Sequence, residues 1–314
     1  MRIGLALGAG GVVGASWTIG ALEALEARTG FSGVDADEVL GTSAGALIGA
    51  LAAARVPLAA MAAYASGEPH DELEQLGQHD ATALRLARVP VPVGPGSWRM
   101  VLSARSRAAV LTGLLPRGVV RTDAIRGLVD RAIGTRWPAC ALRIVACDYA
   151  SGERVAFSRS SVPALTPGEA VAASCAIPAF YAPVRIGGRR YVDGGIDSHS
   201  NVDLLRGRGL DAVICVNPMS SSAWVGGGGM RERLVAARRR RSAAQLASEL
   251  AILRAEGVHV LVLEPAFADL AAMGTDMMAR DRRLEVIEAA RASTERTLRR
   301  LGRRRLGRLG LAAS

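Results

Sequence analysis

The chain has 314 residues, half of them hydrophobic, and carries a formal net charge of +10. This length suits one large domain or two small ones with a substantial buried core. No apolar run reaches the roughly 20 residues that a membrane-spanning helix needs, and no extended apolar segment follows Arg2 as in a signal peptide. We therefore expect a cytoplasmic protein.

All 39 basic residues are arginines, and many gather in Arg238–Arg241 and between Arg296 and Arg308. Arginine binds phosphate well, so an anionic membrane surface and nucleic acid are both candidate partners. The chain has only four residues each of Phe, Trp and Tyr, without the alternation of basic and aromatic residues that stacks bases. This argues against nucleic acid. A solvated helical face is the simplest interpretation of these runs, with peripheral contact to an anionic membrane as the alternative.

The first elements alternate between strand and helix. The apolar patterns predict a strand, a glycine-rich loop and a helix, then a second strand and a second helix. These are Ile3–Leu7, Gly8–Gly14, Ala15–Ala27 (closed by Gly30), Val39–Leu40 and Ala44–Ala54. The order favours an α/β fold with a mostly parallel sheet and helices on both of its faces.

Residues 66–120 interrupt this pattern. They contain a polar stretch and then the proline-rich run 89–96, which excludes a central strand because proline cannot donate to a ladder. We interpret this region either as a lid over a site or as an ordinary helical insertion.

Regular elements resume beyond residue 120. Patterns of apolar residues and turns predict two helices, two strands and a hairpin, then two buried strands and a final helix. In chain order these are helix Thr122–Ile133, strands Leu142–Asp148 and Arg154–Ser158, helix Pro167–Ala176, hairpin Val184–Val192, strands Ala212–Val216 and Val258–Leu263, and helix Asp281–Arg300. Gly226–Gly229 is expected to be a flexible linker.

The most informative stretch is Gly41-Thr42-Ser43-Ala44-Gly45, at the junction of a predicted strand and helix. A serine between two such glycines describes a nucleophile elbow, where the chain reverses so sharply that larger side chains would collide. The hydroxyl of Ser43 would then lie at a helix N-terminus, which favours a developing oxyanion. The alternative is a glycine-rich turn that caps a helix through Thr42 or Ser43.

The glycine loop after the first strand is a candidate source of oxyanion donors. Because it and the elbow follow neighbouring parallel strands, both should open at the same carboxyl edge of the sheet, with the N–H groups of Gly10 and Gly11 toward a substrate carbonyl. Dinucleotide binding is the rival interpretation. The match to G-x-G-x-x-G is poor, since the third glycine falls on Val13, and the second strand ends in the elbow rather than in an acidic residue.

Asp193 is the preferred candidate for the general base. It ends a predicted strand and precedes Gly194 and Gly195, and a carboxylate beside apolar neighbours has a raised pKa that makes it a stronger base. The alternative is a surface Asp-Gly-Gly turn. His199 stays open as a base, whereas His70 and His79 lie in the polar insertion and His259 is expected in the core.

The four cysteines, at positions 140, 147, 175 and 215, form no C-x-x-C pair and no cluster with histidine. We expect buried, reduced thiols and no metal site.

Together these motifs resemble the patatin-like phospholipase family. The resemblance rests on the glycine loop, the elbow, the stretch Ala173–Pro178 and Arg190–Gly195, and it covers roughly residues 3–205. It implies a three-layer, modified α/β-hydrolase-type core with residues 66–120 inserted. Residues 206–314 would complete the same domain with strands, helices and an arginine-rich tail.

The resemblance also implies roles. Ser43 would be the nucleophile and Asp193 the base of a dyad without histidine. Gly10 and Gly11 would form the oxyanion hole, assisted by the amide of Val12. The family loop usually carries Arg or Lys where this chain has Val13, and glycine where it has Ala9.

The expected activity is hydrolysis of fatty acyl esters through an acyl-enzyme, without a metal or organic cofactor. Acyl transfer or thioester cleavage at the same site is the enzymatic alternative, and a lipid-surface binding protein without activity is the other. The oligomeric state is left open.

Overall fold

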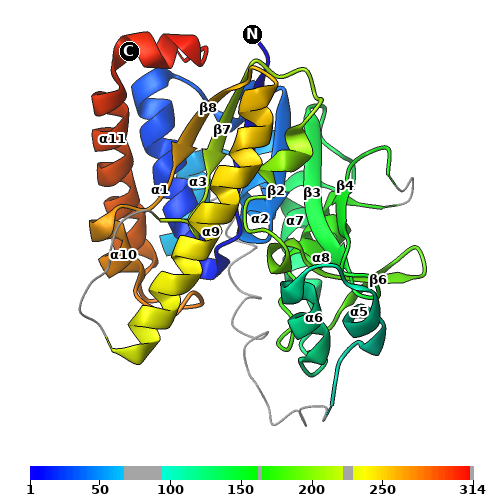
Figure 1. The fold of residues 1–314 in the computed structure, drawn as a ribbon. Helices are drawn as coiled ribbons and strands as arrows, with labels where there is room; N and C mark the ends of the chain where they lie inside the picture. Colours follow the sequence, from blue (N-terminus) through cyan, green and yellow to red (C-terminus); the bar gives the residue numbers. More distant parts are fainter. Residues whose placement is uncertain (67–93, 162–164, 222–228, 312–314) are drawn as a thin grey trace.

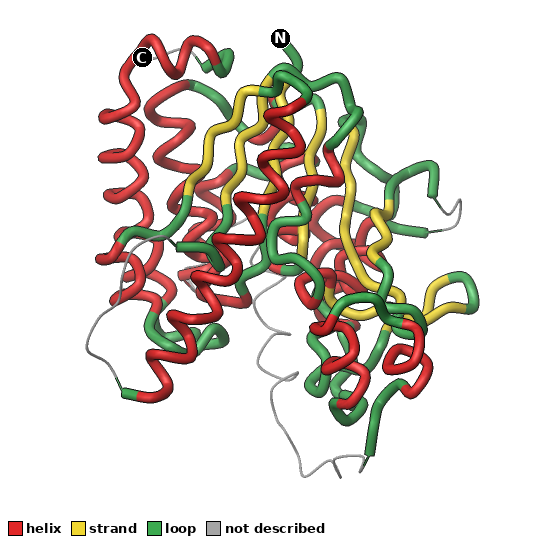
Figure 2. The backbone as a smooth tube through the Cα atoms, viewed as in Figure 1, coloured by secondary structure: helices red, strands yellow, loops and turns green. Residues whose placement is uncertain are grey.

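The computed structural model describes residues 1–66, 94–161, 165–221 and 229–311. One sheet of eight strands runs through the molecule, with helices on both faces (Figures 1 and 2). The hydrogen-bonded order is β5-β6-β3-β2-β1-β7-β8, and β4 also pairs with β3. The arrangement is the mostly parallel α/β fold predicted from the sequence.

The parallel strands form the centre of the sheet, and the antiparallel strands lie on one side of it. Strands β2, β1, β7 and β8 are parallel to one another and to β3, whereas β4, β5 and β6 pair antiparallel. Their bounds are β1 Ile3–Leu7, β2 Glu38–Thr42, β3 Ala141–Asp148, β4 Arg154–Phe157, β5 Val184–Ile186, β6 Arg189–Asp193, β7 Ala212–Val216 and β8 His259–Leu263.

Helices cover both faces of the sheet (Figure 1). Their bounds are α1 Gly11–Thr29, α2 Ala44–Ala53, α3 Leu58–Ser66, α5 Trp98–Ser103, α6 Arg107–Leu114, α7 Asp123–Ile133, α8 Pro167–Ser174, α9 Met230–Ala255, α10 Phe267–Met273 and α11 Arg283–Arg308. Short 3₁₀ helices cover Gly33–Asp35 (η1), Gly194–Ile196 (η2) and Val202–Leu205 (η3). No described helix is long and apolar enough to cross a bilayer.

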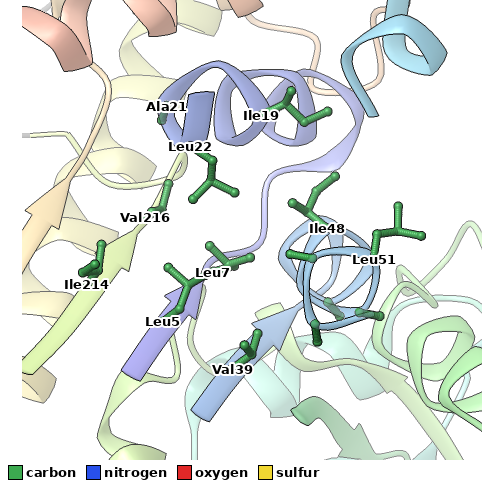
Figure 3. Close-up of a cluster of buried hydrophobic side chains, with 14 of the residues drawn as sticks. Leu5, Leu7, Ile19, Ala21, Leu22, Val39, Ile48, Leu51, Ile214 and Val216 are labelled. Carbon is green, nitrogen blue, oxygen red and sulfur yellow. The ribbon is translucent and has the colours of Figure 1, made fainter. Parts of the chain in front are cut away.

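Alternation along the central strands sends side chains into two cores. In β1, Leu5 and Leu7 join the large cluster that includes residues of α1, α2 and α11, and Figure 3 shows part of it. Ala6, between them, joins the cluster beneath α9 instead. Because successive strand residues face opposite sides, a strand that is buried on both faces reads as a continuous apolar run.

The hairpin prediction is confirmed, and several helix predictions needed correction. β5 and β6 are joined by Gly187 and Gly188, both with positive φ, as a tight two-residue hairpin turn requires. The first helix begins at Gly11 rather than Ala15, because glycine lowers helix propensity and so misleads a boundary drawn from sequence. Helices α3 and α10 and the full length of α9 were not predicted, and α11 continues to Arg308.

Part of the predicted insertion lies in the described region. Residues 94–120 contain α5, α6 and a bridge between Val120 and Tyr181. Residues 67–93 and 226–228 are outside the described residues, so the lid, most of the proline-rich run and the glycine linker stay predictions. So does the division of the chain near residue 205.

Candidate active site

Ser43 occupies the tight turn between β2 and α2. Its backbone has φ 53° and ψ −121°, a conformation that non-glycine residues rarely adopt and that is characteristic of strained functional turns. A Cβ at Gly45 would lie 2.1 Å from the carbonyl oxygen of Leu7, and one at Gly41 would lie 2.5 Å from the Cα of Ala46. Both glycines are therefore required by close backbone contacts, as the sequence predicts.

Ser174, the last residue of α8, fixes the main chain of the elbow. The N–H of Ser43 donates to Ser174 Oγ at 2.8 Å, and Ser174 Oγ donates to the carbonyl oxygen of Val145 at 2.5 Å. This satisfies a buried donor that would otherwise be costly to desolvate. Sequence reasoning noted the Ala173–Pro178 stretch without assigning Ser174 this role.

The register of β3 explains how Ser43 and Asp193 meet. Val145 pairs with both Thr42 of β2 and Ala156 of β4, and Ala146 pairs with both Asp193 of β6 and Val155 of β4. A strand residue has one partner on each edge, so β2 and β6 share the edge of β3 opposite β4. They approach each other end to end, which brings Ser43, the residue after Thr42, next to Asp193.

Asp193 is a buried carboxylate with few partners. It is 6% exposed, and its Oδ1 accepts the N–H of Gly195 at 2.7 Å. Burial raises the pKa of Asp193 to about 6, although hydrogen bonds from Ser43 and from the Gly195 N–H, and the charge of Arg238, oppose the rise. The Ser43 hydroxyl is thus one of the groups that stabilise the charged form of Asp193, and with a pKa of about 6 the carboxylate is mostly ionised near neutral pH.

The glycine loop is shorter than predicted, because α1 already begins at Gly11. The N–H of Ala9 donates to the carbonyl oxygen of His199 at 2.8 Å, and the N–H of Val13 to that of Met277 at 3.1 Å. Between these anchors, the N–H groups of Gly10, Gly11 and Val12 have no acceptor among the described residues. They are the first N–H groups of a helix, which have no intrahelical partner and attract negative charge.

Close packing explains why this loop contains glycine. A Cβ at Gly10 would lie 2.6 Å from the Cα of Gly14 and 2.8 Å from Cγ of Pro218. Gly11 has φ +62°, and a Cβ there would lie 2.7 Å from the carbonyl oxygen of Met277. The loop therefore packs tightly between the segment that follows β7 and the segment that follows α10.

Arg238, Arg240 and Arg241 are exposed on α9, as a solvated helical face predicts, but Arg239 between them is buried. It is 3% exposed and donates from Nη1 to the carbonyl oxygen of Pro218 at 2.6 Å. Burial lowers the pKa of Arg239 to about 10. Pro218 packs against Gly10 and Gly14, so the hydrogen bond from Arg239 to Pro218 helps to hold the glycine loop in place.

His199 is near this loop through its main chain. Its ring Nε2 lies 3.4 Å from Nη2 of Arg238, and the structure records no contact of the ring with Ser43 or Asp193 in the described part of the chain. Burial, together with the charges of Arg238 and Arg239, lowers the pKa of His199 to about 3. The imidazole is therefore neutral at ordinary pH.

From the sequence we also considered three other histidines as bases and the four cysteines as buried thiols. His259 is exposed at the start of the edge strand β8, so the expectation that it lies in the core was wrong. His70 and His79 are outside the described residues. The thiols are free as expected, with Cys147, Cys175 and Cys215 buried and Cys140 half-buried.

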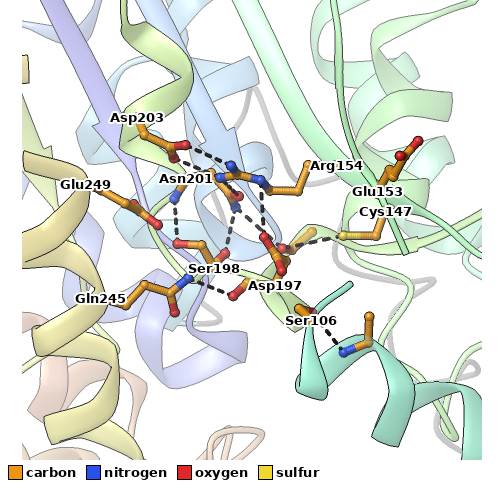
Figure 4. A network of polar contacts seen from close by, with 12 residues as sticks. Ser106, Cys147, Glu153, Arg154, Asp197, Ser198, Asn201, Asp203, Gln245 and Glu249 are labelled. Carbon is orange, nitrogen blue, oxygen red and sulfur yellow. Dashed lines mark hydrogen bonds and ion pairs between the residues drawn. The ribbon is translucent and has the colours of Figure 1, made fainter. Parts of the chain in front are cut away.

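A buried polar network fixes the segment that follows Asp193 (Figure 4). Asn201, which sequence reasoning missed, donates from Nδ2 to Thr42 Oγ1 at 3.0 Å and to the carbonyl oxygen of Ser198 at 2.6 Å. Arg154 donates to Asn201 Oδ1 at 3.1 Å and to both carboxylate oxygens of Asp203 at 2.8 Å. The network joins the residue before Ser43 to the loop after Asp193, and nothing in the local sequence pattern signals it.

A cavity of about 190 Å³ opens from Ser43. Gly11, Val12 and Ser43 line it, together with apolar side chains of α1, α2, α3 and α7. Arg131, Arg280 and Arg283 also line it, whereas no Asp or Glu of the described residues does. The site therefore joins a hydroxyl and available N–H groups to an apolar space with a positive lining, which suits a hydrocarbon chain with a polar or anionic end.

Comparison with known families agrees with this arrangement. Residues 5–206, or 202 of the 314 residues, match the sequence model described as patatin-like phospholipase. The chain belongs to the patatin-like phospholipase family. Membership supports lipid acyl hydrolysis as the general activity, and it confirms the family resemblance inferred from the motifs.

Two solved structures resemble this patatin-like chain. VipD from Legionella pneumophila is 16% identical, with a TM-score of 0.49, and the match covers 95% of this chain and 67% of VipD. The type III effector protein ExoU is 17% identical, with a TM-score of 0.41, and the match covers 95% of this chain and 53% of ExoU. The chain thus spans about two thirds of the length of VipD and about half that of ExoU.

Proposed function

We propose that this protein is a lipid acyl hydrolase of the phospholipase A or esterase type, in which Ser43 is the nucleophile and Asp193 the general base. The observation that carries the proposal is that the register of β3 brings Ser43 next to the buried Asp193 carboxylate. Serine needs an adjacent base to attack an ester, and a base with a pKa near the working pH is the most effective.

The reaction would run in two steps. Asp193 takes the proton of Ser43 as Oγ attacks the ester carbonyl, and it returns that proton to the leaving alcohol when the carbon–oxygen bond breaks. Water then attacks the acyl-enzyme while Asp193 takes a proton from the water. Breakdown of the second intermediate returns the proton to Ser43 and releases the fatty acid.

The oxyanion of both tetrahedral intermediates would be bound by the N–H groups of Gly10, Gly11 and Val12. Two observations support this role. These groups lack acceptors among the described residues, and Gly11 and Val12 line the same cavity as Ser43. Donors that are already in position cost no reorganisation when the charge develops, and removal of one typically costs a factor of about 10²–10³ in kcat.

The cavity lining supports a fatty acyl substrate. Its apolar walls would hold the hydrocarbon chain. The three arginines that line it, with no Asp or Glu among the described lining residues, favour an ester that carries a phosphate or another anionic group.

Covalent labelling tests the assignment of the nucleophile. We expect a fluorophosphonate probe to modify the wild-type protein at Ser43, as located by peptide mass spectrometry, and not to modify Ser43→Ala. Ester turnover by Ser43→Ala should fall by a factor on the order of 10³ or more. Ser220→Ala is the matched control, since Ser220 is also buried and its hydroxyl donates to the carbonyl oxygen of Asn217. Equal labelling of wild type and Ser43→Ala would refute the proposal.

A further inference from the structure

Helices α5 and α6 expose more large apolar side chains than their size explains. The segment 97–115, here called the α5–α6 hairpin, contains five of the twelve exposed large hydrophobic residues of the described chain. They are Trp98 (60% exposed), Leu102 (83%), Leu111 (64%), Leu114 (45%) and Leu115 (44%). Single exposed apolar residues need no explanation, but a group of them on one small unit indicates an interaction surface.

The same hairpin is positively charged without compensation. Arg99, Arg105 and Arg107 are all exposed, and residues 94–122 contain no Asp or Glu. None of the three has a carboxylate within ion-pair distance among the described residues. On α6, Arg107 precedes Leu111 by four residues and so lies on the same side of the helix. Exposed leucine and tryptophan beside arginine, without acidic residues, is typical of a surface that enters the interface of an anionic bilayer.

The hairpin is fixed to the candidate active site. Met100 and Ala109 are buried against Cys147, Tyr149 and Val192, and Val192 immediately precedes Asp193. Ser97 Oγ also donates to the carbonyl oxygen of Tyr149 at 2.6 Å. In Figure 1, α5 and α6 lie beside β6, at the end of the sheet farthest from the two chain termini. The inner side of the hairpin thus packs on the strand that ends at Asp193, while its outer side faces solvent.

We propose that the α5–α6 hairpin docks this protein on bilayers that contain anionic phospholipids. Trp98 and the exposed leucines insert at the level of the headgroups, and Arg99, Arg105 and Arg107 contact lipid phosphates. Docking there brings the edge of the sheet that carries Ser43 and Asp193 to the membrane. The proposal adds a surface to the proposed function and does not depend on it, because binding needs no catalysis.

The arginine-rich end of α11 is the competing surface and provides a matched control. Arg303, Arg304 and Arg305 are exposed, but their apolar neighbour Leu306 is buried. The chain around Gly310 packs on Met1 and Ile3, at the opposite edge of the sheet from Ser43. Docking through this end would direct the site away from the membrane.

Vesicle binding of the full chain separates the two surfaces. Sedimentation with vesicles of phosphatidylcholine, alone or mixed with phosphatidylglycerol, is measured in a Ser43→Ala background so that no lipid is consumed. Three variants are compared: Trp98→Gln/Leu102→Gln/Leu111→Gln, Arg99→Gln/Arg105→Gln/Arg107→Gln, and the control Arg303→Gln/Arg304→Gln/Arg305→Gln. The control loses the same charge as the second variant.

We expect the parent to bind the anionic vesicles more tightly than the neutral ones. The arginine variant of the hairpin should bind anionic vesicles about 10²-fold more weakly, since each arginine near a charged surface contributes about fivefold. The apolar variant should lose at least about tenfold on the same vesicles, and the α11 control less than about twofold. With Ser43 restored, both hairpin variants should still hydrolyse a soluble p-nitrophenyl ester, so loss of docking and loss of catalysis are distinguishable.

A second measurement reports on Trp98 without altering the other hairpin residues. Brominated anionic lipids should quench part of the parent fluorescence, and Trp98→Phe should abolish most of that quenching, because Trp98 is exposed on the hairpin whereas Trp17 is fully buried and Trp137 is half-buried. Both proteins carry Trp224→Phe for this measurement, since Trp224 lies outside the described residues. Three results would overturn the proposal: equal binding to neutral and anionic vesicles, loss of binding only in the α11 control, or a hairpin variant that changes the oligomeric state in solution but not vesicle binding. The last would make the hairpin a contact between copies of the chain.

Discussion

The parallel strands have a buried carboxylate at each of their two ends, here called the amino edge, where the strands begin, and the carboxyl edge, where they finish. The surroundings of these two carboxylates differ. At the amino edge, Glu38 begins β2 and is fully buried, but Arg143 Nε lies 2.5 Å from its Oε1 and Arg208 Nε lies 2.9 Å from its Oε2. At the carboxyl edge, Asp193 is almost as deeply buried, but its Oδ1 accepts the Gly195 N–H and no arginine of the described residues lies within ion-pair distance of it. The charge of Glu38 is therefore balanced by two arginines, whereas Asp193 stays available to accept a proton.

The same contrast extends to the residues around them. At the amino edge, the N–H groups of Arg2 and Ile3 donate to the carboxylates of Asp211 and Asp37. At the carboxyl edge, Ser43 has a strained backbone and three N–H groups of the glycine loop have no described acceptor. Proteins often accept such local instability where function requires it. Substitutions at the two edges should therefore affect different properties.

The largest expected effect is loss of activity in Asp193→Asn. The amide is close in shape to the carboxylate but cannot accept the Ser43 proton, so kcat should fall by a factor of about 10²–10⁴. Turnover of a p-nitrophenyl ester by purified protein measures this. Glu153→Asn, at an exposed carboxylate, is the control and should retain wild-type turnover. Normal turnover by Asp193→Asn would show that Asp193 is not the general base.

Glu38→Gln should show the reverse behaviour. Loss of one partner from a buried ion pair usually costs about 3–5 kcal/mol. We expect about 2–4 kcal/mol here, because the side chains of Arg143 and Arg208 are 23% and 39% exposed and water can solvate them. Urea unfolding measures the free energy of unfolding, while kcat of the folded fraction should be unchanged. A loss of kcat without loss of stability would contradict the division between the two edges.

The pH dependence of stability distinguishes the carboxylates further. Burial raises the pKa of Asp193 from 3.8 to about 6, so between these values the folded protein binds this proton more tightly than the unfolded chain does. The contribution of Asp193 to the free energy of unfolding therefore becomes less favourable as the pH rises from about 4 to about 6, and it is constant at higher pH. Asp193→Asn should be more stable than wild type by up to about 3 kcal/mol at about pH 8, and by little at about pH 4. Unfolding curves of both proteins across this range measure it, and a constant difference would count against the raised pKa.

The sequence was sufficient to predict the central sheet and the residues of the elbow. Apolar runs such as Ile3–Leu7 and Ala212–Val216 indicate buried strands, and the spacing of Gly41, Ser43 and Gly45 indicates a sharp turn. The reason why Ser43 meets Asp193 was not predictable in the same way. It depends on β2 and β6 sharing one edge of β3, and registers between strands about 100 and about 50 residues apart have no local signal.

Other features were missed because tertiary contacts override local pattern. Arg239 looks like its exposed neighbours in sequence, and only the carbonyl of Pro218 and the surrounding side chains make it a buried residue. Ser174 and Asn201 are ordinary polar residues until the fold places them beside Ser43 and Thr42. His259 was misjudged because an apolar strand at the edge of a sheet resembles a central one in sequence.

The smallest expected effect concerns His199, the one alternative base left open by the sequence. Burial lowers the pKa of His199 to about 3, and the contact of this residue with the glycine loop is made by its carbonyl oxygen, which a side-chain substitution preserves. We expect His199→Ala to change kcat by less than about threefold, with the exposed His259→Ala as the matched control. The acid limb of the pH–rate profile should stay near pH 6, because it reports Asp193. If His199→Ala instead lost as much activity as Asp193→Asn, the imidazole would have to reach the serine during turnover, and the carboxylate would orient the base rather than act as one.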